Sequence, residues 1–232
     1  MIAELISKRL QKMENKKDAQ FLQRFFKTGA GQYGEGDVFL GIRVPALRKL
    51  AKEYKTLQPI EVLPLLQSPY HEERLFALIL LVNAFAKGDE ALRRQIYDLY
   101  LSNTQYINNW DLVDISSPNI VGAFLVDKNR KPLYHLAKSK SLWERRISVL
   151  ATFSFIRQNQ FADTIAIAGL LVRDKEDLIH KATGWMLREV GKRDVQCAEL
   201  FLQKHCKEMP RTMLRYAIEK FPPAKRHMYL NG

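Results

Sequence analysis

Trp110 and Asp114, in the stretch NNWDLVD, are the side chains whose types and spacing most directly suggest chemistry. They are four residues apart, and on a helix such side chains emerge on one face, one turn above the other. An indole face attracts cations, and a carboxylate stabilises them. We therefore expect both side chains to face the same ligand. Asp111, between them, stands in the first turn, where the helix dipole favours an outward-pointing acid, and Pro118 is expected to bend or end the helix.

A second tryptophan is framed by cations in the segment 177–192, DLIHKATGWMLREVGK. An apolar stripe that would dock this helix consists of Ile179, Ala182, Met186 and Val190. The adjoining face carries Trp185 with Lys181, Arg188 and Lys192. Cations of this kind hold phosphates while the ring packs on a sugar or base. The alternative is that Trp185 is half-buried against the next repeat, with lysine stems over it.

Arg146 comes one residue before the apolar Ile147 in LWERRISVL, so we expect it at the margin of the core. Its planar guanidinium could grip a backbone phosphate or fix a carboxylate. The alternative is that it is solvated surface, where an ion pair contributes well under 1 kcal/mol.

Apolar residues recur at helical spacing almost throughout, and no strand or hairpin pattern is evident, so the predicted fold class is all-α. A helix start followed by a second helix repeats near residues 70, 108, 143, 178 and 211. This period is typical of HEAT-like repeats, which stack into a solenoid with one concave face. An irregular helical bundle is the alternative.

The predicted organisation is one helical-repeat domain over residues 1–232. It comprises N-terminal helices in 1–66, repeats in 67–221 and a frayed basic tail in 222–232. Five of the eleven glycines fall in residues 28–45, which we expect to be a loop. This loop lacks the Gly-Lys-Ser/Thr ending of a phosphate-binding loop, although its backbone amides and Arg43 could lie near a phosphate.

The charge distribution favours a polyanionic partner, with nucleic acid first and an acidic membrane surface second. The net charge of +12 divides into +5 for residues 1–66, +1 for 67–142 and +6 for 143–232. No run is apolar enough to span a membrane, and the N-terminus does not resemble a signal peptide, so we expect a cytoplasmic protein. Cys197 and Cys206 fit neither a disulfide framework nor a zinc site and are expected to be reduced thiols.

If the repeats stack in register, Trp110 and Asp114, then Arg146, then Lys181 and Trp185 should line one side of the array as a composite site. An aspartate facing a phosphate-binding groove repels the ligand that the cations attract, so it needs a compensating role. One such role is a salt bridge to Arg146. The other is cleavage of an N-glycosidic bond, in which a carboxylate stabilises an oxocarbenium-like sugar and orients water.

The chain resembles the DNA alkylation repair family of HEAT-like-repeat DNA glycosylases, the AlkD type. The resemblance rests on FLGIRVPALRKL (39–50), WDLVD (110–114), LWERRISVL (142–150) and KATGWMLREVGK (181–192), in that order. It implies a concave basic groove that holds duplex DNA and excises N3- and N7-alkylated purines without a metal or bound cofactor. We therefore expect a monomeric enzyme, cytoplasmic and associated with a bacterial nucleoid when on DNA.

The resemblance also implies roles for individual residues. Asp114 falls on the family's catalytic aspartate, Arg146 on its active-site arginine, and Trp110 and Trp185 on the aromatics that contact the lesion's sugar and backbone. Arg188 and Lys192 fall on basic groove positions. Where some members have a tyrosine near the lesion, the nearest match here is Phe25, which keeps a ring but lacks the hydroxyl.

The predicted function is therefore excision of alkylated purines, with two alternatives. The first is a non-catalytic binder of damaged or branched DNA on the same scaffold. The second is a protein-interaction solenoid whose groove accepts an acidic helix or tail. It would be favoured if Trp110 and Trp185 were buried between repeats and the basic residues were scattered over the convex side.

Overall fold

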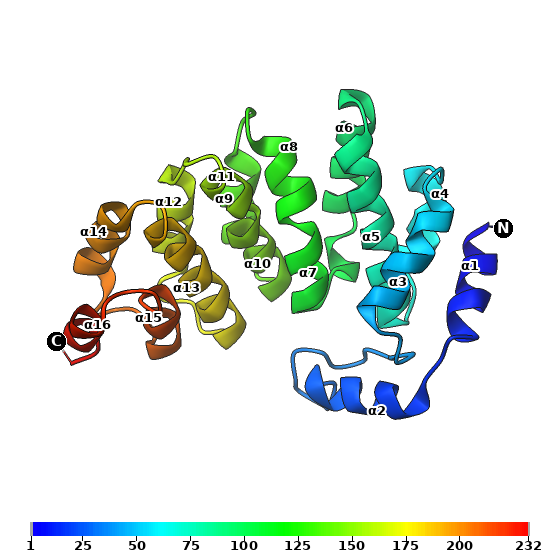
Figure 1. The fold of residues 1–232 in the computed structure, drawn as a ribbon, viewed down its shortest axis with the longest axis horizontal. Coiled ribbons are helices and arrows are strands. Elements are labelled where there is room, and N and C mark those ends of the chain that lie inside the picture. The colour runs from blue at the N-terminus through cyan, green and yellow to red at the C-terminus, as the bar shows by residue number, and fades with distance from the viewer. Residues whose placement is uncertain (1, 232) are drawn as a thin grey trace. The chain divides into compact units, whose positions relative to one another are not determined.

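A computed structural model describes residues 2–231, which form helices joined by turns and loops (Figure 1). Across them no β-strand forms, and the one extended pairing is an isolated parallel bridge between Val38 and Tyr70. The predicted all-α class is confirmed. The chain divides into two compact units, Met1–Ser116 and Ser117–Gly232, which we name unit 1 and unit 2.

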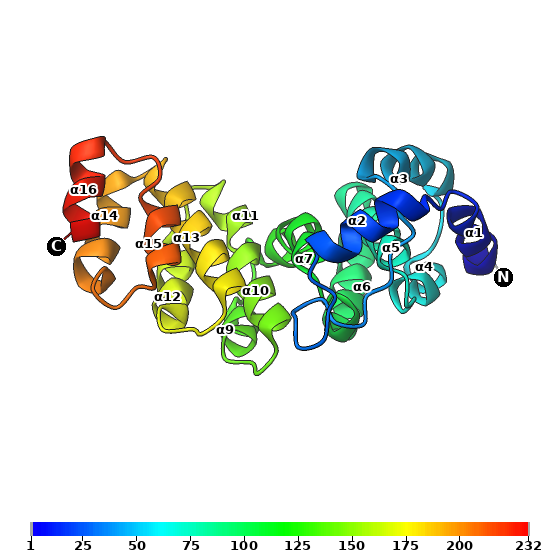
Figure 2. The ribbon, with the colours of Figure 1, turned by 90° about the horizontal axis from the view of Figure 1, so that it is seen from below.

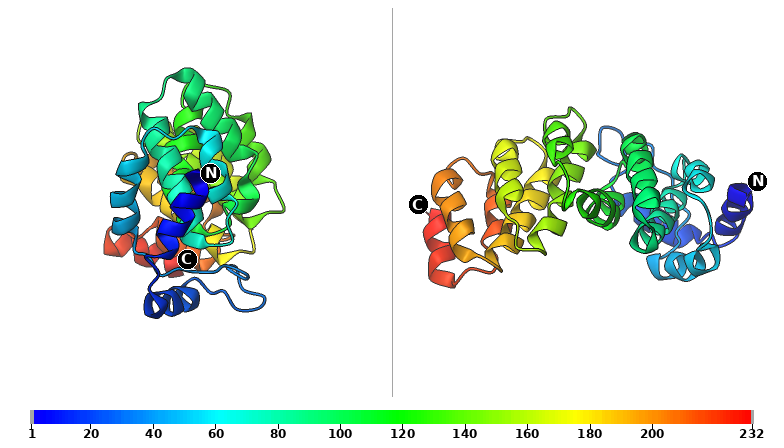
Figure 3. Two further views of the ribbon diagram at one scale, coloured as in Figure 1. Left: turned by 90° about the vertical axis from the view of Figure 1, so that its right-hand side faces the viewer. Right: turned by 90° about the horizontal axis from the view of Figure 1, so that it is seen from above.

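Unit 1 is built around one buried helix. Its helices are α1 (Ile2–Gln11), α2 (Lys16–Phe25), α3 (Val44–Ala51), α4 (Pro59–Leu66), α5 (His71–Lys87), α6 (Glu90–Leu101) and α7 (Trp110–Ser116), with short 3-10 turns η1 (Lys52–Tyr54) and η2 (Thr104–Tyr106). The first eleven residues of α5, from His71 to Leu81, are all buried. From Leu75 to Leu81 this stretch is apolar around the whole circumference, as a covered helix requires. Its first four residues are polar and are held by hydrogen bonds. The helices α3, α4, α6 and α7 pack on α5. The first helix α1, dark blue in Figure 3, packs on α4.

The glycine-rich segment predicted as a loop does connect two helices, α2 and α3. Gly41 in this loop adopts φ +79°, and a Cβ there would lie 2.2 Å from the carbonyl oxygen of Asn15 and 2.6 Å from the amide nitrogen of Ala19. Only glycine fits such a conformation at so close an approach. The loop is thereby seated on the start of α2, which lies across α5 in Figure 2.

Unit 2 also consists of packed helices. It contains the π-helical turn η3 (Pro118–Gly122) and the helices α8 (Ala123–Leu125), α9 (Lys131–Ala137), α10 (Leu142–Ala151), α11 (Phe153–Ile156), α12 (Ala162–Leu171), α13 (Asp177–Gly191), α14 (Val195–His205), α15 (Arg211–Ala217) and α16 (Pro223–Asn231). Its central helix α13 packs on α10, α12, α14 and α15. Figure 2 shows α15 alongside α13, where Gly184 lets the two backbones approach.

The predicted repeat starts agree with the structure. Helices begin at His71, Trp110, Leu142, Asp177 and Arg211, each within two residues of a predicted start. At each of these positions polar residues precede a stripe of buried apolar residues. This change in the local sequence pattern is what indicates the start of the helix.

The expected fraying of the C-terminal segment is wrong, because residues 223–231 form helix α16. Pro223 opens this helix, and its fixed φ suits a first helical position. Tertiary contacts hold the helix in place. A guanidinium nitrogen of Arg211 lies 2.7 Å from the carbonyl oxygen of Leu230, to which it donates, and the Tyr229 ring packs edge-on against Phe221.

Candidate active site

Trp110 and Asp114 lie one turn apart on α7, as predicted, and both side chains are half-buried. The buried face of α7 consists of Leu112, Val113 and Ser116, and α7 packs on α5. The Ser116 hydroxyl is 2.9 Å from the Tyr100 hydroxyl, and burial raises the pKa of that phenol. The α-helix ends at Ser116 and Pro118 begins the π-helical turn, so the expected break at the proline is confirmed.

The Trp110 ring rests on an aromatic cluster formed by α2 and the loop after it. Its centroid is 5.2 Å from that of the buried Phe26 in a stacked arrangement, and 6.0 Å from that of Phe25 in an edge-on arrangement. Phe26 in turn stacks on Phe39 at 5.1 Å. Phe25, 53% exposed, thus lies beside Trp110. One face of Trp110 is consequently supported, and its orientation is restricted.

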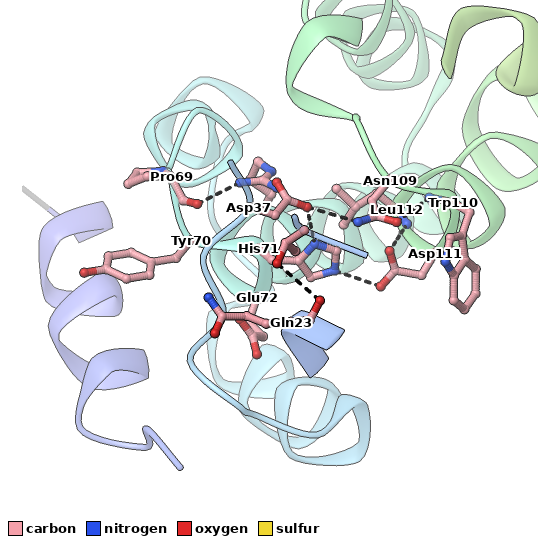
Figure 4. Close-up of polar contacts among 12 residues, drawn as sticks. Gln23, Asp37, Pro69, Tyr70, His71, Glu72, Asn109, Trp110, Asp111 and Leu112 are labelled. Atoms are coloured by element: carbon pink, nitrogen blue, oxygen red, sulfur yellow. Dashed lines mark hydrogen bonds and ion pairs between the residues drawn. The ribbon is translucent and has the colours of Figure 1, made fainter. Parts of the chain in front are cut away.

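A buried polar network holds the residues on either side of Trp110 (Figure 4). The Asn109 amide donates to Asp37 Oδ2 at 3.0 Å, and its Oδ1 accepts the backbone N–H of Trp110 at 2.8 Å. Asp111 Oδ2 lies 2.9 Å from His71 Nε2, while His71 Nδ1 lies 3.2 Å from Asp37 Oδ2. The first turn of α7 is therefore tied to α5 and to the glycine-rich loop.

Asp37 is the acceptor on which this network converges. Besides Asn109 and His71, it accepts a hydrogen bond from Arg74 Nη2 at 2.5 Å. Burial opposes ionisation of Asp37, but the His71 hydrogen bond, the Arg74 charge and the Asn109 amide outweigh it and hold the pKa of the carboxyl below its usual range. Asp37 is therefore an anion in the interior of unit 1, compensated by buried donors.

The expectation that Asp111 points outward is wrong. Its carboxylate turns towards His71, and its other oxygen accepts the backbone N–H of Leu112 at 2.9 Å. A buried ring nitrogen binds the carboxylate more strongly than the helix dipole alone could at the surface. The network residues Asp37, His71 and Asn109 are absent from the sequence-based set of site residues, because they come from three separate segments.

Arg43 is exposed and already has partners within unit 1. Its Nη2 pairs with Asp18 Oδ1 at 2.7 Å and its Nε with Oδ2 at 3.1 Å, a two-pronged contact. Its guanidinium carbon lies 5.8 Å from the ring centroid of Phe21. This pairing holds the pKa of Asp18 below its usual range. Arg43 thus fastens the end of the loop to α2, and phosphate binding by it stays a prediction.

Arg146 is more deeply placed than expected, with 4% of the residue exposed rather than at the margin of the core. One of its guanidinium nitrogens donates to the carbonyl oxygen of Leu178, in the first turn of α13, at 2.5 Å. The side chain is covered because α10, which carries Arg146, packs closely on α13. Arg146 is therefore a buried guanidinium, and not solvated surface.

On α13 the predicted apolar stripe of Ile179, Ala182, Met186 and Val190 is fully buried, as expected. Trp185 on the adjoining face is half-buried, with its ring centroid 5.9 Å from that of Phe153. It also forms a hydrogen bond with Glu189, which contributes to the lowered pKa of that carboxyl. Neither Trp185 nor Trp110 is fully buried, so the burial that would favour the protein-interaction alternative is not observed.

The three cations that frame Trp185 each have a carboxylate partner. Lys181 pairs with Asp177 at 2.7 Å, Lys192 with Glu189 at 2.6 Å, and Arg188 with Glu219. Hydrogen bonding by Lys181 holds the pKa of Asp177 below its usual range. Burial opposes ionisation of Glu189, but Lys192 and Arg193 outweigh it and lower the pKa of that carboxyl. The pKa of Glu219 is lowered chiefly by Lys220 and also by the charge of Arg188. A phosphate would therefore have to compete with a carboxylate at each cation.

Two further residues extend the surface around Trp185. Phe153 of α11 carries the guanidinium of the exposed Arg157, whose carbon lies 4.2 Å from the ring centroid. Arg157, Phe153 and Trp185 therefore form a continuous run of cation and rings. Phe153 and Arg157 are four residues apart, a spacing that places them together on a helix, so the sequence contained a signal for them.

Two kinds of feature are missing from the part of the chain that is described. Within residues 2–231 no group of three or more His, Cys, Asp or Glu side chains is arranged as a metal site. Over the same residues no helix combines the length and apolar character that a membrane crossing needs. Cys197 and Cys206 are free thiols, each half-buried.

Comparison with known proteins supplies context for this geometry. A family model described as DNA alkylation repair enzyme matches residues 6–221. A solved structure described as a predicted DNA alkylation repair enzyme from Enterococcus faecalis superposes with a TM-score of 0.69 at 17% sequence identity, covering 90% of this chain and 97% of that one. At that identity the likeness shows a shared helical-repeat fold. The comparison with curated proteins found no match.

Proposed function

Because this chain belongs to the DNA alkylation repair enzyme family, we propose that it is a DNA glycosylase that excises N3- and N7-alkylated purines from duplex DNA. In this reaction the bond between sugar C1′ and the purine nitrogen breaks, and its electron pair leaves with the base. Water then adds to C1′ and gives up a proton. A purine alkylated on a ring nitrogen is cationic and leaves readily, so the enzyme has no need of a strong general acid.

The observation that carries this proposal is the Trp110–Asp114 pair on one anchored helical turn. Asp114 stabilises the positive charge that develops on the sugar and orients the attacking water. Trp110, supported from behind by Phe25 and Phe26, presents its free surface to the lesion's sugar and backbone. An indole face attracts the same positive charge, so the two side chains act in the same direction.

The residues of unit 2 bind the DNA backbone in this proposal. Trp185 packs on a sugar, and Lys181, Arg188 and Lys192 exchange their carboxylate partners for phosphates. Arg146 belongs to the catalytic set, where a buried and oriented guanidinium holds an anion more firmly than a surface one. We propose that the protein acts as a monomer in the cytoplasm.

The direct test is release of 7-methylguanine and 3-methyladenine from methylated duplex DNA by the purified protein, with the free bases separated by chromatography. The proposal expects both bases to appear with time and in proportion to enzyme. Unmethylated duplex is the matched control, and it should release nothing. Binding of the methylated duplex without any base release would contradict glycosylase activity.

The second candidate is a non-catalytic binder of damaged or branched DNA. It is favoured by Phe25, which has no hydroxyl to offer a lesion, and by the carboxylate partners of the cations around Trp185. Under this alternative we expect the protein to bind branched duplexes more tightly than linear ones, with an affinity that depends on salt. No base should be released from either duplex. Comparable affinities for branched and linear duplexes would remove it.

A further inference from the structure

The two ring nitrogens of His71 both face carboxylates: Nδ1 lies 3.2 Å from Asp37 Oδ2, and Nε2 lies 2.9 Å from Asp111 Oδ2. An ionised carboxylate only accepts hydrogen bonds, and a neutral imidazole has a single N–H. A neutral ring would set a lone pair against one of the two carboxylates. The observed geometry is satisfied by an imidazolium, which donates to both.

The surroundings of His71 decide whether it keeps that charge. The residue is 2% exposed, and burial disfavours protonation. The charged groups that face it are Asp37 from the loop, Asp111 from α7 and Arg74 from its own helix. The effects of burial and of the Arg74 charge are outweighed by the charge of Asp111 and by the hydrogen bonds to both aspartates, and the pKa of His71 rises to about 9.

The aromatic groups around His71 also favour a cation. Its ring stacks on Phe39 with centroids 4.5 Å apart and lies 5.1 Å from Phe26. The faces of such rings attract positive charge, more strongly where water is excluded. Phe26 is the same ring on which Trp110 stacks, so the imidazole and the indole are packed on one support.

The connection to Trp110 is made on both sides of that residue. Asp111, which follows Trp110, is held by His71, and Asn109, which precedes it, is held by Asp37, the other partner of His71. Loss of one His71 proton would leave either Asp37 or Asp111 without its hydrogen-bond donor. One of the two links that hold the residues beside Trp110 would then be lost. The helical turn that begins at Trp110 would then lose its fixed position.

We propose that His71 is a positioning residue for the Trp110–Asp114 site, acting as an imidazolium that clamps the first turn of α7 between Asp37 and Asp111. His71 does not touch the reacting atoms. The consequence for base release rests on the proposed function, whereas the consequence for the Trp110 ring does not.

The experiment follows His71 and Trp110 in one pH titration of the whole protein by ¹H–¹⁵N NMR. The readouts are the imidazole nitrogens of His71, assigned with His71→Gln, and the indole N–H of Trp110, assigned with Trp110→Phe. We expect both signals to change with a common midpoint near pH 9. A midpoint near 6.5, or an indole signal that does not follow the imidazole, would overturn the proposal.

The variant that separates charge from shape is Asp111→Asn, which keeps the size of the side chain and removes its charge. We expect it to lower both midpoints by about one pH unit or more, because the charge of Asp111 is the main influence that raises the pKa. The matched control is Asp177→Asn, which neutralises the partner of Lys181 and should leave both midpoints in place. If Asp111→Asn does not fold, the wild-type titration still decides the question.

Base release supplies a second readout that a merely structural histidine would not move. The alkaline limb of the rate profile for 7-methylguanine release should coincide with the NMR midpoint and shift with it in Asp111→Asn. A limb that stays in place in the variant while the NMR midpoint moves would contradict the positioning role. Absence of base release at every pH would contradict the proposed function and would leave the NMR test of the clamp intact.

Discussion

At the residue scale, the charge on His71 links the stability of unit 1 to pH. A pKa raised in the folded state means a contribution that is complete below the unfolded value of about 6.5 and lost as the pH rises through about 9. We therefore expect the free energy of unfolding to fall between pH 6.5 and 9.5, by at most about 3 kcal/mol. Urea denaturation at a series of pH values measures this fall.

The control for this prediction compares two histidines. His71→Gln should flatten the dependence on pH in that window, because the titrating group is gone. His135→Gln removes an exposed histidine of α9 and should leave the wild-type slope. Equal slopes in wild type and His71→Gln would show that His71 does not carry the dependence.

Which site residues the sequence revealed depends on how far apart their partners lie. Trp110 and Asp114 are one helical turn apart, so their shared face follows from spacing alone. Asp37 and Asn109 are 72 residues apart, and no local pattern indicates that they meet. The contact of Asp111 with His71 is not predictable from local pattern for the same reason, since the two residues are 40 positions apart. Arg146 was placed at the margin because its acceptor, the carbonyl of Leu178, is equally non-local.

At the element scale, the starts of helices were predictable because a polar first turn before a buried stripe is a local signal. The stripe on α13 shows this most clearly, since all four predicted members are fully buried. The helical C-terminal segment was not predictable in this way. Helix α16 has no buried residue, and its place depends on contacts from Arg211 and Phe221.

The packing of α13 on α15 gives a prediction at this scale. A Cβ at Gly184 would lie 2.5 Å from the carbonyl oxygen of Met213 and 2.5 Å from Cβ of Tyr216. Gly184→Ala must therefore push the two helices apart, and we expect it to lower the free energy of unfolding by about 1–3 kcal/mol. Urea denaturation of the purified variant measures the loss.

Gly169→Ala on α12 is the matched control. Nothing lies within 4 Å of a Cβ added there, and alanine is the better helix former. This variant should be unchanged or more stable, by up to about 1 kcal/mol. A Gly184→Ala protein as stable as Gly169→Ala would contradict the close approach of α13 and α15.

At the scale of the whole molecule, the net charge of +12 makes DNA affinity depend on salt, because each phosphate contact releases counterions. Lys181→Ala should reduce the slope of log affinity against log salt by about 0.9 if Lys181 contacts a phosphate. Fluorescence anisotropy with a labelled duplex at several salt concentrations measures the slope.

Lys8→Ala is the matched control for this slope. Lys8 pairs with Glu4 at 2.8 Å and Lys181 with Asp177 at 2.7 Å, both one helical turn apart and both exposed. The two substitutions remove the same charge from the same kind of ion pair. They therefore differ only in whether the lysine lies on the DNA-binding surface of the protein. Equal slopes for the two variants would remove Lys181 from that surface.

The charge balance along the sequence favoured nucleic acid as the partner, and the family match agrees with that direction. The sequence could not show that Arg188 has a carboxylate partner, because Glu219 is 31 residues away. The partners of Lys181 and Lys192 lie within one helical turn, a spacing that local pattern can indicate. These ion pairs reduce the local field that a phosphate meets. Net charge alone therefore overstates how basic this surface is.

The most direct test of the account is the single-turnover rate at which Asp114→Asn releases 7-methylguanine from a duplex that contains one such lesion. Asparagine keeps the shape of the side chain and removes its charge, so we expect the rate to fall by about 10²–10³-fold with DNA affinity unchanged or improved. Asp98→Asn, on the exposed face of α6, should retain the wild-type rate. An Asp114→Asn enzyme that releases the base as fast as wild type would contradict the account.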